Sequence, residues 1–136
     1  MNPELLQALL TMHSPNGWVS LGTVGKGGGP HVTPVMMGVN GDVLLFSLTG
    51  KQKKRNIERD QRVCVALSRT EDLAHVVVWG EMQLRHDAEA QTLWDGLIEG
   101  AFGAEGLAAR RRTLSLEGTS LGVMTPRRYR IYKVTS

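Results

Sequence analysis

The sequence has little of what commonly reveals an activity: cysteine, clustered metal ligands and aromatic side chains. Cys64 is the only cysteine, so no second thiol offers a partner for a redox centre. The apolar neighbours in "RVCVALS" predict a strand with this thiol packed inside. The histidines are dispersed, without carboxylates or cysteines at ligand spacing, which predicts no metal site. They are His13, His31, His75 and His86.

Aromatic residues make up only 5% of the chain, and long apolar runs are missing. Proteins that bind single-stranded nucleic acid stack bases on aromatic side chains. That class is therefore disfavoured, although "RRYRIYKV" interleaves basic and aromatic residues. No run approaches the roughly 18 apolar residues of a membrane span, and the N-terminus, "MNPELLQALLTMHSP", carries an acid where a signal peptide needs a base. We expect a cytoplasmic protein with no membrane association.

The positive charge of the chain is concentrated in one segment. The 136 residues and their 41% hydrophobic content fit a single domain over residues 1–136. The net charge is +3, but residues 51–62 hold six Lys or Arg and two acids, a net +4, which leaves the remainder at −1. Such a local charge predicts a localised anionic ligand rather than a polyanion bound over the whole surface.

Short segments with strand-like alternation dominate the chain and favour a small antiparallel barrel. Asn40 and Gly41 are typical of a tight hairpin, while Asn2 followed by Pro3 is typical of a helix start. One helix is expected after Asn2, one from about Lys51, and one over residues 88–102 with Asp87 as its cap. The expected strands cover residues 17–25, 31–39, 42–49, 62–68, 74–87, 120–126 and 127–134.

The basic segment "KQKKRNIER" suits a helix that starts at about Gly50 or Lys51. Ile57 must then face the barrel, and Lys53 lies one turn earlier on the same face, so it is expected to point inward. Its charge would add to the unpaired N–H groups and positive dipole of the helix start, which together suit a phosphate monoester. Thr49 could donate its hydroxyl to the same oxygens. The residues fit equally well a solvated, charged helix that only covers one end of the barrel.

A resemblance to a known family favours the phosphate site over the solvated helix. The run "LGTVGKGGGPHVTPVMMGVNGDVLLFSLTGKQKKRNIERDQRVCVAL" resembles the pyridoxamine 5'-phosphate oxidase-like, FMN-binding split β-barrel superfamily, in particular its short flavin/deazaflavin-dependent oxidoreductase branch. The segments "VVVWGEMQL" and "GVMTPRRYRIY" continue the resemblance more weakly. It implies a mainly β (α+β) fold, an antiparallel split β-barrel with short flanking helices. It also implies a homodimer with two flavin-type cofactors in clefts between the subunits.

The resemblance also implies which residues hold the cofactor. Its phosphate would be bound by Lys51 and Lys53, with Thr49 as hydroxyl donor and Arg55 as a weaker candidate, and Asn56 would brace the helix against the barrel. The ring system would be lined by strand residues Thr33, Pro34, Val35, Met36, Phe46, Ser47 and Leu48.

The expected function is that of an FMN-dependent oxidoreductase acting on a small unsaturated or quinone-like substrate. In such an enzyme the cofactor performs the redox chemistry, and no catalytic residue stands out from the sequence. Deazaflavin coenzyme F-420 is the alternative cofactor, whose long anionic tail would need additional basic surface such as Arg110, Arg111 and Arg112. A flavin or haem carrier without turnover is the alternative function. Because the sequence ends soon after "RRYRIYKV", we expect no counterpart of the C-terminal arginine- and histidine-bearing segment that longer pyridoxamine phosphate oxidases use for their substrate, so that substrate is not implied.

Overall fold

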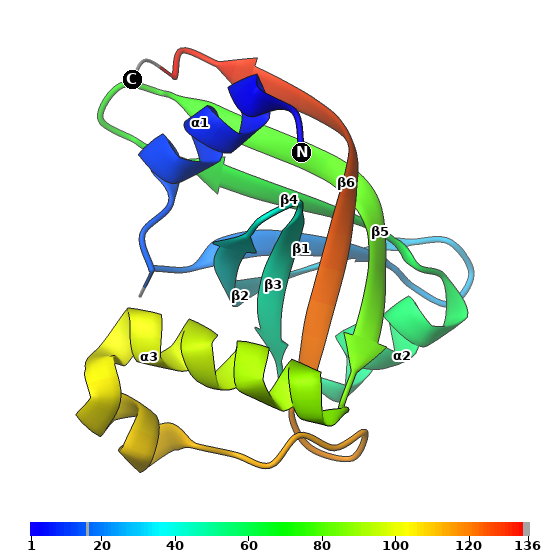
Figure 1. Ribbon diagram of the computed structural model, residues 1–136. Coiled ribbons are helices and arrows are strands. Elements are labelled where there is room, and N and C mark those ends of the chain that lie inside the picture. Colours follow the sequence, from blue (N-terminus) through cyan, green and yellow to red (C-terminus); the bar gives the residue numbers. More distant parts are fainter. Residues whose placement is uncertain (16, 135–136) are drawn as a thin grey trace.

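The computed structural model describes residues 1–15 and 17–134, and its strands close into an antiparallel barrel (Figure 1). The strand order around the barrel is β1-β2-β3-β6-β5-β4, which confirms the predicted mainly β barrel with flanking helices. The strands are β1 (Val19–Val24), β2 (Pro30–Asn40), β3 (Val43–Leu48), β4 (Arg62–Ser68), β5 (His75–Arg85) and β6 (Ser120–Tyr132).

Three helices flank the barrel in the described residues, at the places that the sequence predicts. Helix α1 (Pro3–Met12) is capped by the Asn2 side chain, which accepts hydrogen bonds from the backbone of Glu4 and Leu5. Helix α2 (Lys51–Arg59) follows β3 and places Ile57 in the core. Helix α3 (Ala88–Arg110) packs across β3 and β6 (Figure 1). None of these helices is long and apolar enough to cross a bilayer.

Side chains alternate between the barrel interior and its outer surface. In β4, Val63, Val65 and Leu67 point inward and are buried. Cys64 therefore points outward, and it is half-buried in a surface groove rather than packed in the core, so the prediction of an inward thiol was wrong. Desolvation still raises the pKa of the Cys64 thiol, which keeps it protonated near neutral pH.

Two predicted boundaries differ from the structure. The last two predicted strands are one strand, β6, with a β-bulge where its pairing to β5 shifts register between Trp79 and Gly80. The helix predicted over residues 88–102 runs on to Arg110 across a kink at Gly103, whose φ of 75° favours glycine. Asp87 precedes this helix, but its carboxylate accepts hydrogen bonds from Arg85 instead of capping it.

Candidate functional site

The start of α2 is an uncapped helix end beside the barrel wall. Its N-cap residue is Gly50, and no side chain accepts a hydrogen bond from the first turn. The pairing of β2 with β3 runs from Asn40 with Val43 to Met36 with Ser47, and β3 ends at Leu48, two residues before Gly50. The free N–H groups of a helix start attract anions, so this end of β2 and β3 has the polarity of an anion site.

Lys53 lies over this helix start. A side chain at Gly50 would meet it, because a Cβ atom built there lies 2.9 Å from the Lys53 Cε atom. Lys53 is half-buried and has no hydrogen-bond or ion-pair partner within residues 1–15 and 17–134. Desolvation lowers its pKa below the ordinary lysine value. A partly desolvated, unpaired cation gains more from an approaching anion than a solvated one does.

Two polar atoms on inward-facing positions of β2 lack partners. The hydroxyl of Thr33 and Nδ1 of His31 are inaccessible to solvent and form no hydrogen bond. Leaving such groups unpaired is costly, and each calls for an explanation. Thr33 is a predicted ring-lining residue, and its buried hydroxyl has no hydrogen-bond partner among the described residues.

The other predicted phosphate residues are more exposed, and the fully buried lysine of α2 is a different one. Thr49, Lys51 and Arg55 are exposed. Lys54, which the sequence reasoning missed, is only 3% exposed and donates hydrogen bonds to the backbone carbonyls of Leu116 and Gly118. Its spacing of three residues before Ile57 was the signal for a buried position.

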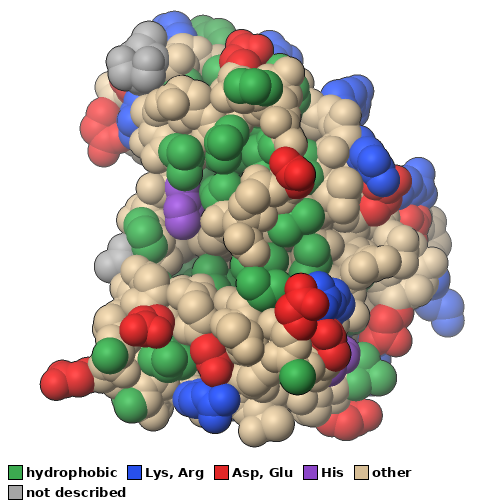
Figure 2. Space-filling model, in the orientation of Figure 1, with side chains coloured by type: hydrophobic (Ala, Val, Ile, Leu, Met, Phe, Trp, Pro, Cys, Tyr) green, Lys and Arg blue, Asp and Glu red, His purple; other side chains and the backbone are tan. Residues whose placement is uncertain are grey.

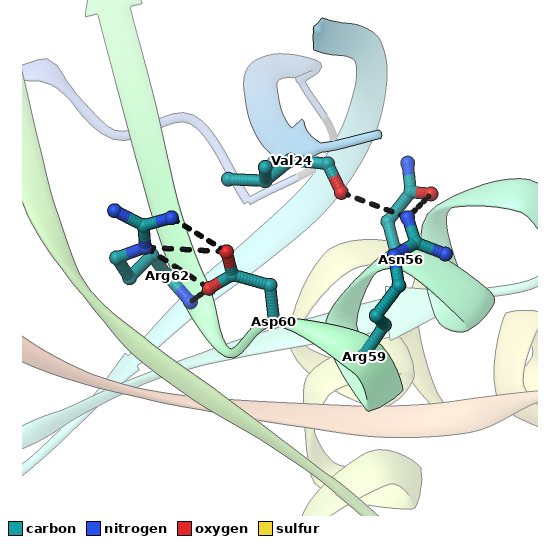
Figure 3. A network of polar contacts seen from close by, with 5 residues as sticks. All are labelled: Val24, Asn56, Arg59, Asp60 and Arg62. Atoms are coloured by element: carbon teal, nitrogen blue, oxygen red, sulfur yellow. Dashed lines mark hydrogen bonds and ion pairs between the residues drawn. The ribbon is translucent and has the colours of Figure 1, made fainter. Parts of the chain in front are cut away.

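A network of polar contacts fixes α2 against the barrel (Figure 3). Asn56 is fully buried and donates from Nδ2 to the Thr23 hydroxyl at 3.0 Å. Arg59 donates both to Oδ1 of Asn56, at 2.9 Å, and to the carbonyl of Val24, at 3.2 Å (Figure 3). The bracing role expected of Asn56 therefore corresponds to observed contacts.

The short turn that follows α2 contains an ion pair at the beginning of β4. Arg62 binds the Asp60 carboxylate with an N–O distance of 2.7 Å (Figure 3). The hydrogen bonds that Arg62 donates to this carboxylate lower the pKa of Asp60 to about 2. This ion pair neutralises one arginine and one acidic residue of the basic segment. The remaining positive charge is therefore concentrated at the other end of α2.

The predicted ring-lining residues divide between the two faces of the barrel wall. Val35, Phe46 and Leu48 are buried in the core, so only their backbone atoms could contact a ligand outside it. Pro34 is exposed on the outer face, and Met36 packs partly against the apolar cluster under α3. The Ser47 hydroxyl accepts a hydrogen bond from the Trp94 indole of α3 at 3.0 Å. Cofactor binding by these residues stays a prediction.

Two of the hollows on the surface are lined in part by strand residues, and both lie outside this helix start. One of about 380 Å³ runs between α1, β2 and α3, where hydrophobic side chains gather on the face shown in Figure 2. A larger groove of about 820 Å³ lies on the outer face of β1, β4 and β5. Neither hollow contains residues of the first turn of α2. The anion site is therefore indicated by the free N–H groups and Lys53 of this turn, and not by a cavity.

Comparison with known proteins gives a family match over nearly the whole chain. The sequence model of the family described as pyridoxamine 5'-phosphate oxidase matches residues 5–130. No curated protein sequence matches the chain.

Solved structures share the barrel at low sequence identity. The conserved hypothetical protein Rv2991 from Mycobacterium tuberculosis is 22% identical, with a TM-score of 0.77 over 97% of this chain and 84% of that one. A protein named F420 reductase is 20% identical, with a TM-score of 0.68 over 90% and 94%. A haem binding protein from Mycobacterium smegmatis is 18% identical, with a TM-score of 0.73 over 97% and 55%. At these identities the similarity shows the fold alone.

Proposed function

Because the chain belongs to the pyridoxamine 5'-phosphate oxidase family, we propose that it is an oxidoreductase that binds FMN and reduces a small unsaturated or quinone-like molecule. The observation that carries this proposal is the start of α2. There, an uncapped helix end and the half-buried Lys53 offer unmatched donors suited to one phosphate group.

The residues of the chain then have distinct tasks. Lys53 and the N–H groups of α2 would hold the phosphate, with Lys51 adding charge from the exposed side. Pro34 and Met36 would contact the ring from the outer face of β2, while Ser47 is held in place by Trp94. A flavin held there would supply the hydride chemistry, while the residues of the chain would bind its phosphate and position its ring.

The surroundings of the arginine cluster support FMN over coenzyme F-420. The guanidinium of Arg110 lies 4.0 Å from the centre of the Phe102 ring, and Arg111 forms an ion pair with Asp95 at 3.1 Å. Two of the three arginines at the end of α3 thus already have partners. A long anionic tail would have to compete with these contacts, whereas FMN needs only the helix start.

Titration with FMN and riboflavin tests the proposal. Riboflavin has the same ring but no phosphate, so FMN is expected to bind at least about tenfold more tightly, as measured by flavin fluorescence. Equal affinity would refute the phosphate site. Parallel titrations with coenzyme F-420 and haem examine the alternatives: a Soret band on adding haem, without any flavin binding, would favour the carrier function.

We also propose that the protein forms a twofold homodimer. Trp18 and Val32 are large apolar residues that are 71% and 64% exposed. Trp18 directly precedes β1 and Val32 is an outward-facing residue of β2; on the same surface Pro34 is exposed and Ser20 and Gly22 are small. An exposed apolar surface of this kind marks an interaction site, and an isologous contact would bury it in both copies.

Light scattering is expected to give a mass of about 30 kDa, twice the chain mass of 14.9 kDa. Val32→Lys should shift the protein toward the monomer, because a charge would be buried in the contact. The matched control is Leu73→Lys, since Leu73 is similarly exposed, at 62%, between β4 and β5. A parent protein of monomer mass at micromolar concentration would contradict the dimer.

A further inference from the structure

The hollow of about 380 Å³ between α1, β2 and α3 is apolar and nearly free of charge. The two helices lie on either side of β2 (Figure 1). The apolar walls include Leu10 of α1, Leu45 of β3, and Leu93 and Leu97 of α3. Among the described residues that line the hollow, only His13 has a side chain that can ionise. The volume suits one small ring system, and the ligand should be uncharged, because burying an unpaired charge is costly.

The hollow contains a strand edge without a partner strand. β1 pairs with β2 only as far as Val19 with Val35, so no strand covers that side of the following β2 residues. Asn40 closes a two-residue turn with Val43, which makes this a hydrogen-bonded pair. The main-chain groups of alternate residues point to opposite sides of an antiparallel strand. Those of Val39 therefore point away from β3 and toward the hollow.

The contact of His13 with β2 supports this direction. Its Nε2 atom donates a hydrogen bond to the carbonyl of Met37, two residues before Val39 and hence on the same side of the strand. The N–H and carbonyl of Val39 have no partner within residues 1–15 and 17–134. The Val39 side chain packs against the barrel core, so its main chain lines the hollow. A free N–H group in an apolar hollow favours a ligand with a hydrogen-bond acceptor.

The face of α3 above this edge leaves space for such a ligand. A Cβ atom built at Gly96 or Gly100 would meet no other atom within 4 Å, and both glycines line the hollow. A Cβ atom at Gly38 of β2, in contrast, would lie 2.7 Å from Cδ1 of Leu97. α3 thus touches β2 at Leu97 and stands clear of it beside the two helix glycines.

The hollow lies next to the place proposed for the flavin ring. Gly38 lines the hollow, and Met36, a proposed ring contact, is the preceding outward-facing residue of β2. Residues two apart on a strand are separated by about 7 Å along it. A ligand in the hollow is therefore close enough to lie against the ring, as hydride transfer requires.

We propose that this hollow binds the substrate, and that the substrate is an uncharged, conjugated ketone. Its carbonyl accepts a hydrogen bond from the Val39 N–H group, and its ring lies between the leucines of α1 and α3. None of the residues proposed for the homodimer contact lines this hollow, so a ligand and a second copy do not compete for it. The assignment as substrate site rests on the proposed function, but binding can be measured without flavin.

NMR titration of the ¹⁵N-labelled protein with 1-indanone tests the hydrogen bond. The ketone should move the Val39 amide proton downfield, whereas indane, the same ring system without the carbonyl, should bind without this shift. Val39→Pro removes the N–H group at an edge position where proline breaks no ladder hydrogen bond. It should weaken indanone binding about fivefold, followed through the amide signals of Gly96 and Gly100. Indane should bind this variant like the parent, which is the control for an intact hollow.

Charge and volume provide a second test. 1-Oxoindane-5-carboxylate is expected to bind at least about fivefold more weakly than its neutral isostere 1-oxoindane-5-carboxamide, because no lysine or arginine lines the hollow. Gly96→Leu should fill the hollow and abolish binding of both indanone and indane. Gly96→Ala is the matched control: it also replaces a helix glycine but adds one methyl group, and should retain most of the binding.

Four results would overturn the inference: the same Val39 shift with indane as with indanone, equal effects of Val39→Pro on both probes, carboxylate binding as tight as that of the carboxamide, or a fall in mass by light scattering when indanone is added. The last would show that a second copy of the chain occupies the hollow. If FMN binds but indanone does not, this inference fails and the proposed function stands. If indanone binds at Val39 but no flavin binds, the proposed function and the assignment as substrate site fail, while the ketone site stands.

Discussion

Replacing Lys51 and Lys53 together by alanine is expected to weaken FMN binding at least about tenfold, or about 1.4 kcal/mol. A hydrogen bond to a charged group contributes about 1.5 to 3 kcal/mol, and solvent screening reduces the share of the exposed Lys51. Folding should be barely affected, because Lys53 has no partner among the described residues to lose and Lys51 is exposed. Fluorescence titration with FMN measures the loss.

A lysine outside the site serves as the control for this double variant. Arg59 lies two turns from the helix start and would be a natural control. However, it donates hydrogen bonds to the carbonyl of Val24 and the side chain of Asn56. Replacing Arg59 would loosen α2, so a change in FMN affinity could come either from a lost contact with the phosphate or from a displaced helix. Lys26→Ala, in the exposed turn between β1 and β2, changes the charge without touching α2 and should leave the affinity unchanged. A double variant that binds FMN as tightly as the parent would show that the basic segment is only a solvated face.

The pH dependence of the same titration identifies Lys53. Desolvation lowers its pKa below the ordinary value, so in the free protein Lys53 begins to lose its proton at a lower pH than a solvated lysine. Only the protonated form attracts the phosphate, and FMN affinity should therefore fall as the pH rises toward the ordinary lysine pKa of about 10.4. Lys53→Arg keeps its charge over this range and should give a flatter profile. Profiles of equal slope would exclude Lys53 as the anchor.

Phe46→Ala is expected to destabilise the protein by about 3 to 5 kcal/mol, the usual cost of removing a buried phenyl ring and leaving a cavity. Phe46 is fully buried among the core residues inside the barrel. Its neighbour on the strand, Ser47, faces the opposite side and is bonded to Trp94. Denaturant unfolding should show a lower midpoint, with a loss of FMN binding only to the extent that the fold is lost.

The other phenylalanine of the chain provides a matched control. Phe102 lies on α3, is partly exposed, and has the guanidinium of Arg110 over its ring. Phe102→Ala removes the same atoms but only a surface contact, so it should cost less than about 1 kcal/mol. If Phe46→Ala unfolds no more easily than Phe102→Ala, but binds FMN weakly, then Phe46 acts on the cofactor and not through the core.

The sequence by itself determined the features that depend on neighbouring residues. Alternation located the strands because side chains two apart share a face, and Asn2 with Pro3 marked a helix start because both act on the first turn. The concentration of lysine and arginine after β3 identified the one segment that could attract an anion. None of these inferences needs to know which strand lies beside which.

Tertiary structure decided which face of each element is buried. In "RVCVALS" both faces are apolar, and only closure of the barrel assigned Val63 and Val65 to the core and Cys64 to the groove. On α2, neighbouring positions differ by about 100° around the axis, so Lys53 and Lys54 both fit the inward face. The 111–119 segment settled the matter, because its carbonyls at Leu116 and Gly118 accept the Lys54 ammonium group.

The bulge in β6 was equally beyond the sequence. Its position depends on pairing with β5, a strand about 45 residues away along the chain, and an extra residue changes which side chains face outward without any local signal. The approach of the strands there is so close that a Cβ atom at Gly80 would lie 2.1 Å from the carbonyl oxygen of Thr125. Only long-range pairing could therefore bring Arg128 and Trp79 to one groove, because the free energy that fixes the register comes from residues distant in the sequence.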